Sequence, residues 1–191
     1  MLTDRPSLIC LRAAVLALVL AFGMPHANAA TIIARSDVEL TEMSDAVVVA
    51  TVERVAFERA EDGSLQTRNT LTVESWWTGQ GPSTIDVLQT GGEADGVKQA
   101  LNGDFKLHEG KRVVMFLRQG PDAWYSTLLS WSVFDITGSG ITATVQRQGG
   151  DLALKKRGAD GLLHDVARSD EPQSLGGLKV NVQVLGRKGV K

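Results

Sequence analysis

Short apolar stretches separated by glycine-containing turns run through most of this chain, and this pattern constrains the fold more than any other feature. Residues 65–73 alternate in character, as a strand with one buried face requires. Residues 46–52 and 113–117 are apolar at nearly every position, which is typical of strands covered on both faces. Asp62-Gly63 predicts a type I′ hairpin turn, which needs positive φ at both central residues. Several such strands at short intervals predict a mainly β fold.

A change of parity inside the first long strand makes the expected architecture more specific. The apolar residues pass from Val52 to Val55 and Phe57, so the inward face switches. This switch predicts a bulge or sharp bend near Glu53-Arg54, as a strand needs when it turns a barrel corner. We therefore predict a closed or partly closed antiparallel barrel. Its expected core residues are Val48, Val52, Leu71, Val73, Val87, Val113, Met115 and Leu117.

Short helices are expected at both ends of this barrel. Ser36-Asp37-Val38-Glu39 has the form of a capping box and predicts a helix over 37–44. Near the C-terminus, Ser174 is placed to cap a helix with a stripe of Leu175, Leu178, Val182 and Leu185. Gly176 and Gly177 weaken that helix, and the sequence from Val180 to Val184 alternates like a strand. Helix is favoured narrowly over strand.

The first 29 residues have the three parts of a secretion signal. Arg5 and Arg12 precede an apolar run over 13–22, and Ala27-Asn28-Ala29 is a small-x-small cleavage pattern. We expect cleavage after Ala29 or Ala30, and export to the periplasm or the extracellular space. The run is too short to span a membrane. Residues 30–191 then form one β-barrel domain, with its core over about 34–155 and a tail over 156–191.

Charge and cysteine content exclude several function classes. The formal charge is −2, and it becomes −3 when Asp4, Arg5 and Arg12 leave with the signal, so nothing favours binding to nucleic acid. Cys10 is the single cysteine and precedes the expected cleavage point. We therefore expect no disulfide-linked oligomer, no thiolate metal site and no cofactor.

The candidate site is a glycine-rich and acidic segment between two well-patterned strands. Gly91, Gly92, Glu93 and Asp95 are expected to present a partner-binding loop, although the glycines alone would also suit a tight strand connection. Trp76 is predicted to point away from the core, where it could anchor a partner. The leading interpretation is a non-enzymatic binding module for a protein, for example an extracellular protease, or for a glycan.

A small secreted hydrolase is the alternative interpretation. It would use the carboxylates of Glu93, Asp95 and Asp104 together with His108. No nucleophile elbow or metal-binding spacing accompanies these residues, so no catalytic or metal residue is predicted.

Three motifs resemble those of a known group of proteins. The segment Ser44–Val52 (SDAVVVATV), then Gly91-Gly92-Glu93, then Glu109–Leu117 (EGKRVVMFL) is similar to a family of uncharacterised exported bacterial proteins with an SDAVVVGTV…GGE…GERVVLFL series. In outline these proteins resemble the OB-type barrel of tissue inhibitors of metalloproteinases and netrin-like modules. The resemblance covers about residues 34–136 and implies an OB-like fold.

The chain departs from that family at several points. Ala50 stands where a glycine is usual, Trp76-Trp77 replaces an aliphatic-lysine pattern, and Trp131-Ser132 replaces a frequent Gln-Gly. The metalloproteinase inhibitors chelate zinc through an N-terminal cysteine. The expected mature chain begins at Ala30 and has no cysteine, so the resemblance does not carry that mechanism over.

Overall fold

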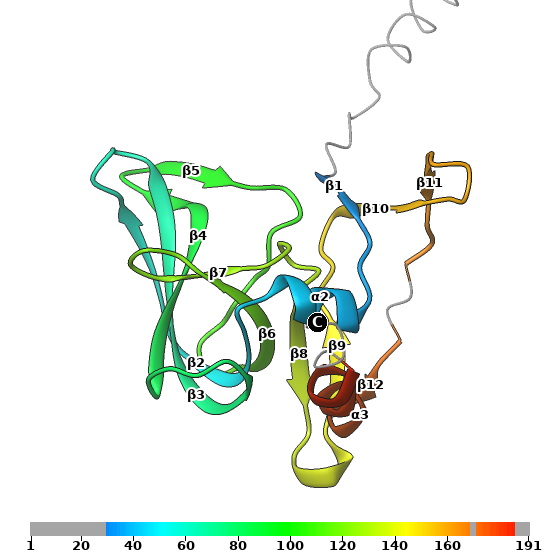
Figure 1. Cartoon of the computed structure of the whole chain (residues 1–191). Coiled ribbons are helices and arrows are strands. Elements are labelled where there is room, and N and C mark those ends of the chain that lie inside the picture. Colours follow the sequence, from blue (N-terminus) through cyan, green and yellow to red (C-terminus); the bar gives the residue numbers. More distant parts are fainter. Residues whose placement is uncertain (1–29, 169–170, 186–191) are drawn as a thin grey trace, which may run out of the picture.

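Five strands close a β-barrel in the computed structural model, which describes residues 30–168 and 171–185 (Figure 1). The predicted secretion signal lies outside the described residues. The barrel strands are β2 (Ala46–Arg59), β3 (Leu65–Thr78), β4 (Thr84–Ala94), β6 (Arg112–Gln119) and β7 (Trp124–Ser126).

The barrel closes through one short strand. Around its circumference the order is β2, β3, β4, β7, β6 and back to β2. Every pair is antiparallel except β4–β7, which is parallel. The predicted OB-like barrel is confirmed, with the correction that it is not wholly antiparallel. The segment from Gly120 turns β7 back along β6, and this direction places β7 parallel to β4.

A bulge bends β2 where the parity change predicts. The β2–β3 register shifts between Val52 and Arg54, which confirms the expected bulge at the barrel corner. Further shifts lie between Val47 and Val48 and between Val49 and Ala50.

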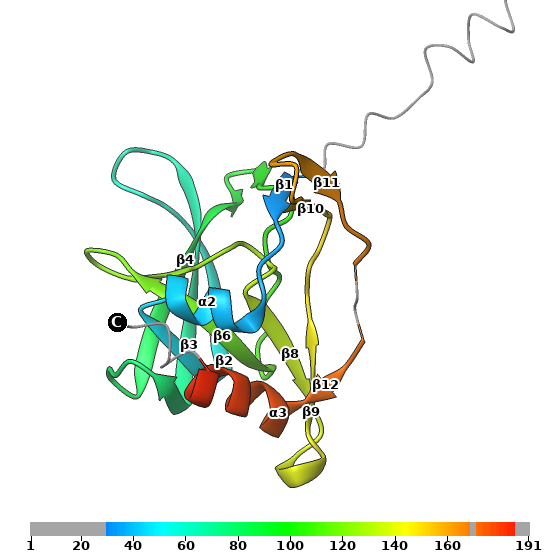
Figure 2. The same cartoon turned by 45° about the vertical axis from the view of Figure 1, so that its right-hand side comes forward.

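The remaining elements extend the barrel sheet beyond β6 and β4 or lie beside it. From β6 the sheet continues through β8 (Val133–Thr137), β9 (Thr144–Arg147) and β12 (Gln173–Ser174), and from β4 through β5 (Val97–Ala100). A separate sheet contains β1 (Ala30–Ile33), β10 (Leu152–Arg157) and β11 (Leu163–Asp165). The helical elements are α2 (Asp37–Met43), η1 (Gly140–Thr142), α3 (Leu175–Val180) and η2 (Asn181–Leu185), and Figure 2 shows α2 and α3 on the same side of the β2–β6 region.

Two apolar cores share the strands β2 and β6. The side chains of Val113 and Met115 point into the barrel, whereas those of Val114 and Phe116 pack in an outer core under the helices. This sharing explains why these strands are apolar at consecutive positions. The predicted barrel-core residues all lie in or against the inner core, with Val73 only partly buried.

Both predicted helix caps are present. The Ser36 hydroxyl accepts a hydrogen bond from the Glu39 backbone N–H at 3.3 Å, and the Glu39 carboxylate accepts one from the Ser36 N–H at 2.8 Å. Ser174 Oγ accepts a hydrogen bond from the Gly177 N–H at 3.0 Å, which confirms helix rather than strand at the start of the tail. Leu178 and Val182 are fully buried in the outer core.

The predicted type of the β2–β3 turn was wrong. Gly63 has φ +81° but Asp62 does not have positive φ, so the β2–β3 turn is not type I′; the Gly63 N–H instead donates to the Ala60 carbonyl. Between β7 and β8 the chain makes a turn in which Leu129 has φ +48°. The 3₁₀ turn η1 connects β8 to β9.

Candidate functional site

The glycine-rich segment is a hairpin, not an open loop. Gly91 and Gly92 lie within β4, and Gly91–Ala94 pair with β5. Asp95 and Gly96 connect the two strands with φ values of +52° and +74°. Positive φ at both central residues is the mark of a type I′ turn, so this turn has the geometry that was expected at Asp62-Gly63.

Gly91 is required because two backbones meet there. A Cβ built on Gly91 would lie 2.5 Å from the Gln99 carbonyl oxygen, and φ is +96°. The Thr67 hydroxyl donates a hydrogen bond to the Gly91 carbonyl at 2.8 Å. The hydrogen bond therefore holds the β4–β5 hairpin to β3. The tight strand connection that was the alternative explanation of Gly91 and Gly92 thus holds alongside any binding role.

Ion pairs hold the acidic side chains at this end of the barrel. Arg59 Nε donates to Asp95 Oδ2 at 3.0 Å, which joins the β4–β5 hairpin to the end of β2. Lys98 Nζ lies 3.8 Å from Glu93 Oε2. All four side chains are exposed, so these pairs position the carboxylates while adding little to stability. We call residues 57–64 together with 91–101 the hairpin surface.

Large apolar side chains lie exposed on the hairpin surface. Phe57 is 55% exposed, Val97 52% and Leu101 47%. Phe57 lies beside Gly92, where an added Cβ would come within 3.1 Å of its ring. Exposed aliphatic and aromatic groups beside carboxylates are typical of a protein-binding patch.

The predicted orientation of Trp76 was wrong. Trp76 is half-buried and packs against the barrel core and Trp124, with ring centroids 5.7 Å apart, while Trp77 lies in the outer core. The β2–β3 register shift between Val49 and Ala50 reverses the alternation of β3 before these residues. Trp76 is also ten residues along β3 from Gln66, the partner of Thr90. The structure therefore does not bring it to the hairpin surface, and its role in binding stays a prediction.

Asp104 and His108 lie outside the hairpin surface, in the lining of a pocket of about 400 Å³. Asp135 and Asp151 line the same pocket. Burial raises the pKa of the Asp104 carboxyl, although the Phe105 N–H donates to its Oδ1 at 2.8 Å. Glu93 and Asp95 do not line this pocket. The structure thus divides the four residues of the hydrolase interpretation between two places.

The raised pKa of Asp104 predicts a pH-dependent stability. Because the folded state binds this proton more tightly than the unfolded chain, stability from Asp104 falls as pH rises through its folded pKa. Asp104→Asn is therefore expected to raise the melting temperature at pH 7, with a gain that shrinks toward pH 4. Thermal unfolding at both pH values, with exposed Asp122→Asn as control, measures this. A destabilised variant at pH 7 would contradict it.

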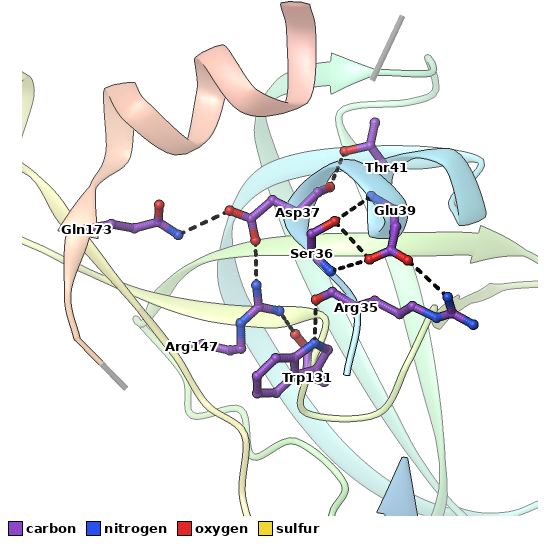
Figure 3. Close-up of polar contacts among 8 residues, drawn as sticks. All are labelled: Arg35, Ser36, Asp37, Glu39, Thr41, Trp131, Arg147 and Gln173. Atoms are coloured by element: carbon purple, nitrogen blue, oxygen red, sulfur yellow. Dashed lines mark hydrogen bonds and ion pairs between the residues drawn. The ribbon is translucent and has the colours of Figure 1, made fainter. Parts of the chain in front are cut away.

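A pocket of about 520 Å³ surrounds Arg147, a residue that no sequence motif identified. Arg147 Nη2 donates to Asp37 Oδ1 at 2.5 Å, and Nη1 donates to the Trp131 carbonyl (Figure 3). The guanidinium carbon lies 4.3 Å from the Trp131 ring centroid and 4.2 Å from that of Phe134. Cation–π contacts of this kind stabilise a desolvated arginine.

This cluster ties distant segments together. Burial lowers the pKa of Arg147 to about 10, against the opposing effect of Asp37, so the guanidinium stays charged at neutral pH. Trp131 Nε1 donates to the Arg35 carbonyl at 2.9 Å, and Gln173 Nε2 donates to Asp37 Oδ2 at 3.4 Å. Because the polar groups of the cluster form hydrogen bonds with one another, we interpret the cluster as structural: it joins α2, β9 and β12. Its sequence signal was the alternation that puts Arg147 on the same face as buried Val145.

Comparison with known proteins adds no assignment: no protein-family model, curated protein or solved structure matches the chain. Within residues 30–168 and 171–185, no helix is long and apolar enough to cross a membrane. Across the same described ranges, no group of three or more His, Cys, Asp or Glu side chains is arranged to hold a metal ion.

Proposed function

We propose that this protein is an exported, non-enzymatic binding module that recognises a protein partner through the hairpin surface. The single observation that carries the proposal is that surface itself. Exposed Phe57 and Val97 lie there beside the exposed carboxylates of Glu93 and Asp95. In OB-type barrels the first hairpin loop and the neighbouring strands are the usual binding region, and here they adjoin the β4–β5 hairpin.

Rigidity supports this proposal. The buried hydrogen bond from Thr67 to the Gly91 carbonyl and the close approach of the Gly91 and Gln99 backbones order the hairpin before any partner arrives. A surface already ordered in its binding conformation loses little conformational entropy on association. A glycan partner, the other ligand class considered from the sequence, would find in Phe57 one aromatic ring to stack on.

Removing the two carboxylate charges should weaken partner binding. The double variant Glu93→Gln with Asp95→Asn is expected to reduce the association rate about tenfold at low salt. Charges at the edge of an interface act mainly by speeding the diffusional encounter of the two proteins. Asn suits the positive φ of position 95, so the turn persists. The test immobilises the purified protein, identifies the captured protein from the secreted fraction by mass spectrometry, and measures its binding kinetics.

Glu42→Gln, an exposed carboxylate on α2, is the matched control and should bind like the wild type. The rate difference should shrink in high salt, where exposed charges are screened. Unchanged kinetics in the double variant would place the site elsewhere on the barrel. Binding of a glycan array in place of a protein would reassign the ligand class.

A hydrolase remains the second candidate because Asp104 and His108 line one pocket and the Asp104 pKa is raised. A carboxyl of raised pKa is suited to general acid catalysis. We expect no turnover of peptide, ester or glycoside substrates above a heat-inactivated control. Turnover abolished by Asp104→Asn, with the fold retained, would replace the binding proposal.

Export is part of the proposal and rests on the signal pattern of residues 1–29. Mass spectrometry of the periplasmic and secreted fractions should find a mature N-terminus at Ala30 or Thr31. Recovery of the uncleaved chain from the cytoplasm alone would contradict export.

A further inference from the structure

The outer edge of β5 indicates how a partner could be held, and this inference rests on the proposed function. We propose that an extended, basic segment of the partner protein adds to β5 as a further strand of the sheet. Strand addition supplies main-chain hydrogen bonds for affinity and alternating side-chain contacts for specificity. The occupant is one class of ligand, an extended polypeptide carrying positive charge.

The edge is open along β5. In the described part of the chain, β5 ends the nine-stranded sheet and pairs with β4 alone. Its four residues are all exposed. At the opposite end of the same sheet, β12 has two residues and continues directly into α3, so it presents no comparable row of backbone groups.

The hairpin geometry specifies which backbone groups face outward. In a two-residue hairpin the residues that flank the turn, here Ala94 and Val97, form a hydrogen-bonded pair. Hydrogen-bonded and non-hydrogen-bonded pairs then alternate along the ladder. Lys98 and Ala100 therefore direct their N–H and C=O groups away from β4, toward an incoming strand.

The usual protections of an edge strand are weak here. Natural edges carry proline, bulges or unpaired charges that discourage pairing. Residues 97–100 contain no proline, and the β4–β5 register runs without a shift. Lys98 is the one charged residue in β5, and Glu93 partly neutralises it at 3.8 Å.

Local charge selects a basic occupant. The hairpin surface carries the exposed carboxylates of Glu61, Asp62, Glu93 and Asp95, opposed among exposed groups by Arg59 and Lys98. The Arg59–Asp95 pair brings the β2–β3 turn and the hairpin tip together, so these carboxylates act on one region. A segment with lysine or arginine at alternate positions would meet this negative field, while Val97 offers it an apolar contact.

The test uses the purified protein and a capped Lys-Val-Lys-Val-Lys-Val peptide, followed by NMR titration and amide exchange. Saturating peptide should slow exchange of the Lys98 and Ala100 amide protons at least about tenfold, as new hydrogen bonds require. Lys98→Pro removes an outward N–H and should weaken binding about tenfold. The matched control Lys98→Ala keeps that N–H and should bind at least as tightly as the wild type.

Each other outcome overturns the inference. No detectable binding at millimolar peptide, or equal binding by Lys98→Pro, excludes strand addition at β5. Equal binding by a peptide N-methylated at alternate residues shows that charge alone acts, and preference for a Glu-Val peptide shows that the charge argument is wrong. If Lys98→Pro captures the native partner normally while Glu93→Gln with Asp95→Asn does not, the inference fails and the proposed function stands. If neither variant affects capture, both fail.

Discussion

Replacing Asp37 with alanine is expected to lower the free energy of unfolding by about 3–5 kcal/mol, because it leaves the buried guanidinium of Arg147 without its counter-ion. The side chains of Asp37 and Arg147 are only 15% and 11% exposed. Solvent therefore reaches only a small part of the guanidinium and replaces the lost carboxylate poorly, and the Trp131 and Phe134 rings supply the remaining stabilisation of the charge.

Urea unfolding of three variants separates the charge effect from lost packing. Asp37→Ala combined with Arg147→Met should recover a large part of the loss, since the uncompensated charge is gone. Asp165→Asn breaks the exposed Lys155–Asp165 pair and should change stability by less than about 1 kcal/mol. If Asp37→Ala with Arg147→Met is no more stable than Asp37→Ala alone, the unpaired charge of Arg147 is not the cause of the lost stability.

Leu71→Ala is expected to lower the free energy of unfolding by about 2–5 kcal/mol, because it opens a cavity in the barrel core. Leu71 is fully buried and packs among residues of four barrel strands and the 105–107 segment, which limits how far the site can collapse. Chemical denaturation measured by tryptophan fluorescence tests this.

Thr72→Ala is the matched control for the barrel core. Thr72 is the next residue of β3, points outward and donates a hydrogen bond to the exposed Glu53 carboxylate. Thr72→Ala should lower the free energy of unfolding by less than about 1 kcal/mol. Equal losses at positions 71 and 72 would mean that the inward face of β3 is assigned incorrectly.

Local sequence patterns predicted the elements and much of the barrel. The parity change at Val52 located the bulge, and the capping box located the first residue of α2. These signals are local because a cap, a bulge or an alternating face depends on residues a few positions apart. The same reasoning chose Leu71 for the core.

The candidate site was predictable only in part. Glu93 and Asp95 were identified from composition, and both lie exposed at a hairpin tip. Their neighbour Phe57 was not identified, since its exposure depends on how far β2 extends beyond the barrel. Trp76 was oriented incorrectly because Glu74 is an extra residue of β3 at the Val49/Ala50 register shift, which reverses the alternation of the residues that follow it.

The sequence by itself determined the main barrel strands and both terminal helices, where the first strand bends and which residues of β3 face inward as far as Val73. The tertiary structure alone decided the closure of the barrel by the parallel β4–β7 pair, the separation of Glu93 from Asp104, and the pairing of Asp37 with Arg147. The physical reason is distance along the chain. Asp37 and Arg147 are 110 residues apart, and such a contact depends on how every intervening strand pairs rather than on any pattern near either residue.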